Sequence, residues 1–376
     1  MSVERSADQL VDGISTWVRL ESPSHAPDTL RAMAKLISDQ SRAAGLTVTE
    51  TDHGATTGPS LTITNRAAGD DRKGILILAH YDTVHPVGTL TKNDCRIEDG
   101  KLFGPGTYDM KGGTYLALTA LGDLSGANDT QLPVEFLIVP DEEVGSLHSR
   151  PTIESHAARA KYTLVCEPAR ANGGRCVSAR KGTGFITVEA HGRPSHAGVA
   201  HEKGRSAIRE IAHQVLALAA MTDYERGITV SVGKIEGGTT TNVVPSFAKI
   251  TVDFRIPDPE AGVELKAKVD ALKAHDPDVK LVVNFDLNRP PMPRTEATGE
   301  LLKTVQAYAT QAGFALEEAP MTGGGSDANF TAALGVPTLD GLGADGDGAH
   351  TLFEHILIAT LPERLKFWQL TLKQLA

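Results

Sequence analysis

The feature of this sequence that most limits its fold is a set of short, almost wholly apolar runs. The run "GILILAH" (Gly74–His80) has no polar residue before its last position, and "PVEFLIVP" and "YTLVCEP" are similar. Runs of this kind are typical of strands that are covered on both faces. A helical pattern, "GGTYLALTALGDL", stands between the first and the second run. We therefore expect an α/β fold with a mixed, largely parallel sheet sandwiched by helices.

The pattern changes near residue 180. The segment "GFITVEAHG" alternates like a half-exposed strand, and the segments after it predict the order β-α-β-β-α-β of a ferredoxin-like fold. Segments of the first type return after residue 289. We therefore predict a main domain made of residues 1–180 and 290–376, with residues 181–289 inserted into it as a second domain.

Charge and composition exclude several classes of protein. The net charge is -10 without a long basic run, so we expect no nucleic-acid partner. No apolar run approaches the roughly 18 residues of a membrane helix, and the first residues lack the apolar core of a signal peptide. The three cysteines, Cys95, Cys166 and Cys176, have no CxxC spacing. This pattern predicts neither a disulfide framework nor a cysteine-rich metal site, and it fits the reducing cytoplasm.

Imidazole and carboxylate side chains follow the predicted strands or lie in glycine-rich loops. Open α/β sheets bind their ligands at the carboxyl ends of their strands. The side chains expected there are His80, Asp82, Asp109, Glu142, Glu143, Glu167 and His350. Imidazole and carboxylate without thiolate suit zinc, cobalt or manganese. One His, one Asp, two Glu and a second His are too many for one tetrahedral ion with an open position, but they suit two ions that share a carboxylate.

Each of these residues also has a plainer interpretation when taken alone. Asp109 lies between glycines and could be a turn residue. The adjacent acids Glu142 and Glu143 could be solvated surface, and His350 is one of 13 histidines. Adjacent carboxylates raise each other's pKa, so burial of this pair would favour a nearby cation. The recurrence of such residues at equivalent places favours the metal site.

The order of the motifs resembles that of the co-catalytic di-zinc metallopeptidases. This family includes aminoacylases, acetylornithine and succinyl-diaminopimelate deacylases and bacterial glutamate carboxypeptidases. The motifs are "HYDTV", "GPGTYDMKGG", "DEEVGS", "EP", "GRPSHAG", "GGTTTNVVP", "GGGSDANF" and "GAH", and they cover residues 74–350. The segments "GGGSDA", "EPARA" and "LPERL" make the chain most similar to the glutamate carboxypeptidases.

The resemblance implies a centre of two divalent ions, Zn²⁺ in the first place, with Co²⁺ or Mn²⁺ as alternatives. One ion would be held by His80, Asp109 and Glu167, and the other by Asp109, Glu143 and His350. Glu142 would be the general base that takes a proton from water and passes it to the leaving nitrogen. Asp82 would orient His80 from behind. The resemblance also implies a cis peptide bond after Asp109.

The inserted domain would be a lid and dimerisation domain by the same resemblance. His196 would reach into the site of the partner subunit and stabilise the oxyanion. The residues implied in substrate binding are Asn242, Arg255, Arg289, Gly324 and Gly325. Arg289 is the candidate for a bidentate clamp on a substrate carboxylate. The histidines His85, His148, His191, His201 and His355 lie near motifs and are interpreted as bystanders.

These features predict a cytoplasmic, homodimeric metallohydrolase that cleaves an amide bond next to a free carboxylate and releases a C-terminal amino acid. Its substrates would be small N-acyl or peptidyl amino acids, with neither nucleic acid nor membrane as a partner. One alternative is a deacylase for basic or neutral N-acyl amino acids, and a second is a specialised catabolic amidohydrolase. A third, from another class, is a binding protein that keeps the metal pocket without catalysis.

Overall fold

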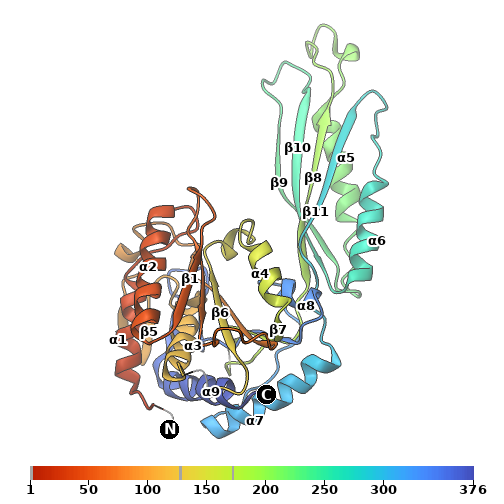
Figure 1. Cartoon of the computed structure of the whole chain (residues 1–376). Helices are drawn as coiled ribbons and strands as arrows, with labels where there is room; N and C mark the ends of the chain where they lie inside the picture. Colours follow the sequence, from red (N-terminus) through yellow and green to blue (C-terminus); the bar gives the residue numbers. More distant parts are fainter. Residues whose placement is uncertain (1–2, 127–128, 172) are drawn as a thin grey trace. The chain divides into compact units, whose positions relative to one another are not determined.

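The computed structural model describes residues 3–126, 129–171 and 173–376, and the chain divides into two compact units (Figure 1). The first unit comprises Met1–Ala179, Arg294–Thr322 and Ser326–Ala376. The second comprises Arg180–Pro293 and the short segment Gly323–Gly325. In the described part of the chain, no helix combines the length and the apolar character that crossing a membrane requires.

A mixed sheet forms the centre of the first unit. Its strands are, in sheet order, β1 (Thr47–Thr51), β2 (Ser60–Thr64), β6 (Val134–Val139), β3 (Gly74–His80), β7 (Ala160–Val165) and β12 (Thr338–Leu339). The last four run parallel to one another, whereas β1 and β2 are antiparallel to their neighbours. Every residue of β3 and β6 is buried, as their apolar runs predict. The predicted fold class is confirmed.

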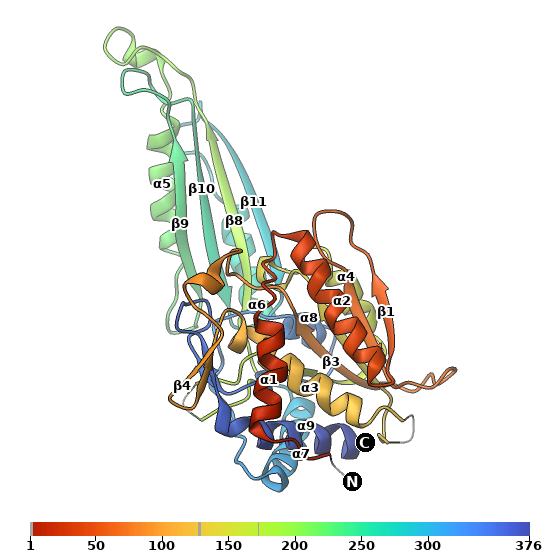
Figure 2. The same cartoon turned by 90° about the vertical axis from the view of Figure 1, so that its left-hand side faces the viewer.

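Helices flank this sheet (Figures 1 and 2). They are α1 (Ala7–Val18), α2 (Pro27–Ala43), α3 (Gly112–Asp123), α4 (Arg150–Ala157), α7 (Glu296–Ala312), α8 (Ala328–Ala333) and α9 (Leu361–Gln374). Helices α1, α3 and α9 contact one another and α7 contacts α9, while α2 contacts β1 and β2 and both α4 and α8 contact β7. Trp17 of α1 and Trp368 of α9 are wholly buried. These large side chains anchor the helices to the core.

A small antiparallel sheet brings distant loops of the first unit together. Its strands are, in sheet order, β13 (Gly346–Asp347), β14 (His355–Leu357), β5 (Lys101–Phe103) and β4 (Arg96–Glu98). The loop between β13 and β14 carries His350, and the helical turn η2 (Thr107–Lys111) that follows β5 carries Asp109. Pairing of β14 with β5 therefore places these two loops side by side. The other single-turn helices are η1 (Thr89–Thr91), η3 (Glu142–Val144), η4 (His201–Lys203) and η5 (Ile358–Thr360).

The second unit has the predicted order β-α-β-β-α-β. Its elements are β8 (Gly182–His191), α5 (Ala207–Ala219), β9 (Thr229–Gly237), β10 (Phe247–Ile256), α6 (Pro259–Asp270) and β11 (Lys280–Arg289). The strands form an antiparallel sheet in the order β11-β8-β10-β9, which is a ferredoxin-like arrangement. Burial alternates along β8 and β10, because one face of each strand meets the core that contains Ile186, Ile250 and Phe254.

The second unit also includes Gly323–Gly325, which the predicted range 181–289 leaves out. Arg180 Nη1 donates a hydrogen bond of 2.9 Å to the carbonyl oxygen of Gly324. A Cβ atom at Gly325 would lie only 2.7 Å from Cδ of Arg289, so the glycine permits a close approach. Such contacts pack the segment on the second unit, although its sequence neighbours belong to the first.

Candidate metal centre

The carboxyl ends of the three central strands meet at one edge of the main sheet. His80, the last residue of β3, is paired with Val139 at the end of β6, and the N–H of Cys166 after β7 donates to the carbonyl of Leu78. The turn after β6 carries Glu142 and Glu143, and Glu167 follows β7. Since parallel strands end on the same side, His80 and these three carboxylates are delivered to one place.

The two carboxylate oxygens of Asp109 face different histidines. Oδ1 lies 3.3 Å from Nε2 of His80, and Oδ2 lies 3.4 Å from Nε2 of His350. His80 Nε2 is also 3.8 Å from Oε1 of Glu167, while His350 Nε2 is 3.2 Å from Oε2 of Glu143. Asp109 therefore stands between one histidine–carboxylate pair and another, which is the geometry that a bridging carboxylate needs.

Two of these residues, Asp109 and His350, have unusual backbone conformations. The peptide bond between Asp109 and Met110 is cis, which confirms the expectation from the sequence. His350 has a positive φ of 64°, a conformation that residues other than glycine adopt rarely. The side chain of His350 is 54% exposed, whereas that of His80 is 2% exposed. The cluster is therefore shielded from solvent at His80 and accessible to solvent at His350.

The carboxylates of the cluster are buried close to one another, which disfavours their charged forms. Oδ1 of Asp109 and Oε1 of Glu143 are buried and have no hydrogen-bond partner among the described residues. Burial and the charge of Asp109 raise the pKa of Glu143 to about 8, and the same two causes raise the pKa of Glu167 well above its ordinary value. Imidazole nitrogens and buried carboxylate oxygens without hydrogen-bond partners are a set of ligands that suits zinc, cobalt or manganese.

Asp82 supports the centre in two ways. Oδ1 of its carboxylate accepts the N–H of Glu142 and Oδ2 accepts the N–H of Glu143, both at 3.2 Å. Ser24 Oγ donates to Oδ2 at 2.6 Å. Nδ1 of His80 lies 3.0 Å from the backbone oxygen of Asp82 and 3.4 Å from its carboxylate, so the shorter contact is to the backbone. A proton held on Nδ1 leaves the lone pair of Nε2 directed at the cluster.

Glu142 and Glu143 lie on a helical turn instead of an extended strand. In a strand their side chains would point to opposite faces. The turn η3 ends at Gly145, which has a φ of 94°. Ligand atoms of Glu142, His80 and Glu167 lie within 4.8 Å of one another, and so do those of Glu143, His80 and Asp109. Both glutamates therefore reach the same cluster.

In the second unit, the predicted residues His196 and Asn242 lie on adjoining loops. The N–H of Ala197 donates to the carbonyl oxygen of Asn242 at 2.9 Å. Nδ1 of His196 accepts the N–H groups of Gly198 at 3.1 Å and Val199 at 3.2 Å. An imidazole that accepts at Nδ1 carries its proton on Nε2 when it is neutral. The exposed His196 side chain therefore presents a donor to solvent.

The predicted substrate-binding arginines differ in their surroundings. Arg255 forms two hydrogen bonds with the carboxylate of Asp253, of 2.8 Å and 2.7 Å, and a third of 3.2 Å with the carbonyl of Gly323. Its fork is thus already occupied by a carboxylate. Arg289 is 4% exposed and packs against Gly325. Its Nη1 donates a hydrogen bond of 3.1 Å to Oδ1 of Asn288, so both arginines have partners within the second unit.

Sequence reasoning missed Glu354, which lies just before β14. The residue is wholly buried, and its carboxylate bonds to Nε2 of His85 at 2.8 Å. His85, which is interpreted from the sequence as a bystander, is thus the buried partner of a carboxylate. The sequence feature that could have indicated Glu354 is an acid within the otherwise apolar segment "LFEHIL". Acids are almost never fully buried unless they are paired.

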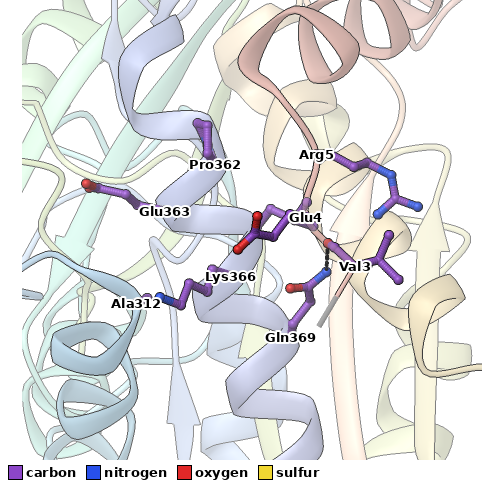
Figure 3. Close-up of a pocket in the computed structure, with 9 residues that line it drawn as sticks. Val3, Glu4, Arg5, Ala312, Pro362, Glu363, Lys366 and Gln369 are labelled. Carbon is purple, nitrogen blue, oxygen red and sulfur yellow. Dashed lines mark hydrogen bonds between the residues drawn. The ribbon is translucent and has the colours of Figure 1, made fainter. Parts of the chain in front are cut away.

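One cavity of the first unit reaches the metal centre. It has a volume of about 370 Å³, and its wall includes Glu143 beside Pro23, Val84, Pro86, Val87 and Val144. A different cavity, of about 230 Å³, lies between the N-terminal segment and α9, where Val3, Glu4 and Lys366 line it (Figure 3). None of the candidate metal ligands lines this second cavity. Of these two cavities, only the first is lined by a candidate metal ligand, Glu143.

Comparisons with known proteins identify similar proteins over most of the chain. The model of Peptidase family M20/M25/M40 matches residues 76–374. Carboxypeptidase G2 of Pseudomonas sp. (strain RS-16) is 30% identical over 364 residues, which are 95% of this chain and 86% of that protein. Succinyl-diaminopimelate desuccinylase of Paracidovorax citrulli is 29% identical over 74% of this chain and 73% of its own length. An aminopeptidase of Bacillus cereus has a similar fold, with a TM-score of 0.76 at 24% identity over 98% of both chains.

Proposed function

The chain belongs to Peptidase family M20/M25/M40, and from this premise we propose that it releases a C-terminal amino acid by cleaving the amide bond next to a free carboxylate. The resemblance inferred from the motifs is thereby confirmed, and the chain is a hydrolytic enzyme. The observation that carries the proposal is the position of Asp109 between the pairs His80–Glu167 and His350–Glu143.

Two divalent ions would act as Lewis acids that polarise the substrate carbonyl and lower the pKa of water. Zn²⁺ is the first choice, and Co²⁺ or Mn²⁺ are alternatives. His80, Asp109 and Glu167 would hold one of the two ions. Asp109, Glu143 and His350 would hold the other. The nitrogen–oxygen distances of 3.2 to 3.8 Å support this division, since His80 approaches Asp109 and Glu167 whereas His350 approaches Asp109 and Glu143.

Glu142 would move the proton of the reaction. It would take a proton from the attacking water and deliver it to the leaving nitrogen, so that the amide bond breaks to a carboxylate and an amine. The N–H of Glu142 is fixed by the carboxylate of Asp82 at 3.2 Å. This contact holds the backbone of the base while its side chain exchanges the proton.

Residues of the second unit would bind the substrate and the developing negative charge. His196 would donate from Nε2 to the oxyanion, a role that its two acceptor contacts at Nδ1 support. We propose that it acts from the partner subunit of a homodimer, with Asn242 in the same pocket. Arg289 would clamp the carboxylate of the substrate, with Arg255, Gly324 and Gly325 beside it. We propose a cytoplasmic location as well. This proposal is supported by the three cysteines, which form no disulfide bond among the described residues.

We propose that the cavity beside Glu143 takes the acyl side of the substrate. Its wall combines proline, alanine and valine side chains with Ser24, His25, Thr83 and Glu143 and includes no lysine or arginine, so it suits an apolar group better than a carboxylate. With a volume of about 370 Å³ it has room for an aromatic ring. We therefore propose substrates in which an apolar acyl group or residue is joined to an acidic amino acid.

A panel of substrates tests this choice. N-benzoylglutamate is expected to exceed N-acetylglutamate in kcat/KM by about 10- to 100-fold, because burial of a ring contributes roughly 1.5–3 kcal/mol. Val87→Asp should reduce this ratio, whereas Val263→Asp, at an exposed valine of the second unit, should leave it unchanged. Equal rates for the two substrates would contradict the acyl site.

The same panel separates the alternatives. Faster cleavage of acyl-ornithine or acyl-methionine than of acyl-glutamate would favour the deacylase of basic or neutral amino acids, an activity class to which the desuccinylase relative points. Cleavage of none of these, but of another C–N bond, would favour a specialised catabolic amidohydrolase. Absence of any hydrolysis that EDTA abolishes would favour the binding protein without catalysis.

A further inference from the structure

We propose that Glu354 is a positioning residue of the metal centre, which fixes the loop of Asp109 and joins it to the loops of His80 and His350. This inference rests on the proposed function only in taking Asp109, His80 and His350 as ligands. Glu354 is 0% exposed. It lies in the first unit, four residues after His350, in the same connection between β13 and β14.

The carboxylate of Glu354 is saturated with hydrogen bonds. Oε1 accepts the backbone N–H groups of Tyr108 at 2.9 Å and Asp109 at 2.8 Å. Oε2 accepts the N–H of Gly106 at 2.9 Å and contacts Nε2 of His85 at 2.8 Å. A carboxylate has about four acceptor sites, so each oxygen uses both of its lone-pair directions.

These partners belong to different loops of the centre. The N–H groups of Gly106, Tyr108 and Asp109 converge on the carboxylate from the turn that carries Asp109, as backbone amides do in anion-binding nests. His85 lies three residues after Asp82, in the loop that leaves His80. One buried side chain therefore links the three loops that present His80, Asp109 and His350.

The position of Asp109 depends on this link. Fixing the N–H groups of Tyr108 and Asp109 holds the two successive peptide planes that lead to the Cα atom of Asp109, and so fixes the point from which its side chain extends. Its two oxygens must face two sites, and such constellations tolerate displacements of only about 0.5 Å. Loss of a side chain that supports a ligand from behind typically lowers metal affinity by about 10- to 100-fold.

A buried carboxylate that has no place in the metal centre provides the matched control. Glu135 of β6 is 6% exposed, and its oxygens contact Nδ1 of His156 at 2.7 Å and Nε of Arg66 at 3.0 Å. It is paired with Leu76 of β3, four residues before His80, toward the amino ends of the strands. Glu135→Gln thus disturbs a buried carboxylate network of similar size at the other end of the sheet.

The experiment compares the full-length variants E354Q, E354A and E135Q with the unchanged protein. It measures the Kd and stoichiometry of Zn²⁺ by competition with a chelating dye, the thermal unfolding of the metal-free protein, and kcat and KM at fixed and saturating Zn²⁺. We expect E354Q and E354A to weaken binding of at least one ion by about 10- to 100-fold. Their kcat should fall at fixed Zn²⁺ and recover partly at saturating Zn²⁺, with KM changed less than about threefold.

Comparison with the control shows whether Glu354 positions the metal ligands or only stabilises the fold. Both E354Q and E135Q should unfold at lower temperature, but only E354Q should lose Zn²⁺ affinity. Unchanged Zn²⁺ affinity in E354Q, or an equal loss in E135Q, would overturn the proposal. If E354A does not fold, E354Q and His85→Phe test the proposal. His85→Phe removes one of the four donors to the Glu354 carboxylate, so it should weaken Zn²⁺ binding less than E354Q does. Zn²⁺ binding is measured without substrate, so failure of the proposed hydrolysis leaves this test intact.

Discussion

The Glu142→Gln variant is expected to lose about 10²- to 10⁴-fold in kcat while it still binds both metal ions. Glutamine has nearly the same shape as glutamate but cannot take a proton from water. The backbone N–H of residue 142 bonds to Asp82 whichever side chain follows, so the turn should keep its conformation. Turnover of the best substrate of the panel and metal content by mass spectrometry are the two measurements.

The neighbouring variant Glu143→Gln is the matched control for Glu142→Gln. Oε2 of Glu143 lies 3.2 Å from Nε2 of His350, and its Oε1 has no hydrogen-bond partner among the described residues. This variant should therefore lose affinity for one ion, with activity that returns in part at high Zn²⁺. Loss of metal in Glu142→Gln, or full activity in it, would show that the base and the ligand are wrongly assigned.

Asp109→Ala is expected to lose both ions, whereas His350→Ala is expected to lose one. Asp109 approaches His80 through Oδ1 and His350 through Oδ2, so its removal takes a ligand from each set. His350 contacts Asp109 and Glu143 among the described residues of the cluster. Since even a supporting side chain behind a ligand is worth about 10- to 100-fold in affinity, the loss of a shared ligand should exceed about 10²-fold for both ions.

Equilibrium dialysis against buffered Zn²⁺, followed by elemental analysis, measures these stoichiometries. We expect about two ions per chain in the unchanged protein, one in His350→Ala and none in Asp109→Ala at a free Zn²⁺ that saturates the unchanged protein. Asp109→Ala should have no detectable hydrolysis even at excess Zn²⁺. One tightly held ion in Asp109→Ala would contradict the bridging position of this carboxylate and favour two independent sites.

Local patterns in the sequence determined the framework of the site. The apolar runs predict β3 and β6 because burial on both faces excludes polar residues from every position of a strand. The position of His80 and Glu167 directly after such runs places them at the carboxyl edge of the sheet. The split into a mixed α/β unit and a ferredoxin-like unit follows from the change in periodicity near residue 180. The motifs in their order then lead to the family without any coordinates.

Contacts between distant segments were decided only by the tertiary structure. Glu354 lies 245 residues from Asp109, whose N–H it accepts, and 269 residues from His85. No periodicity marks such a pair, because the energy of a buried carboxylate depends on which donors the fold brings to it. The approach of His350 to Asp109 depends likewise on pairing of β14 with β5. The sequence alone determined which side chains could bind metal, but only the folded chain determined which of their oxygens and nitrogens meet, since those contacts are non-local.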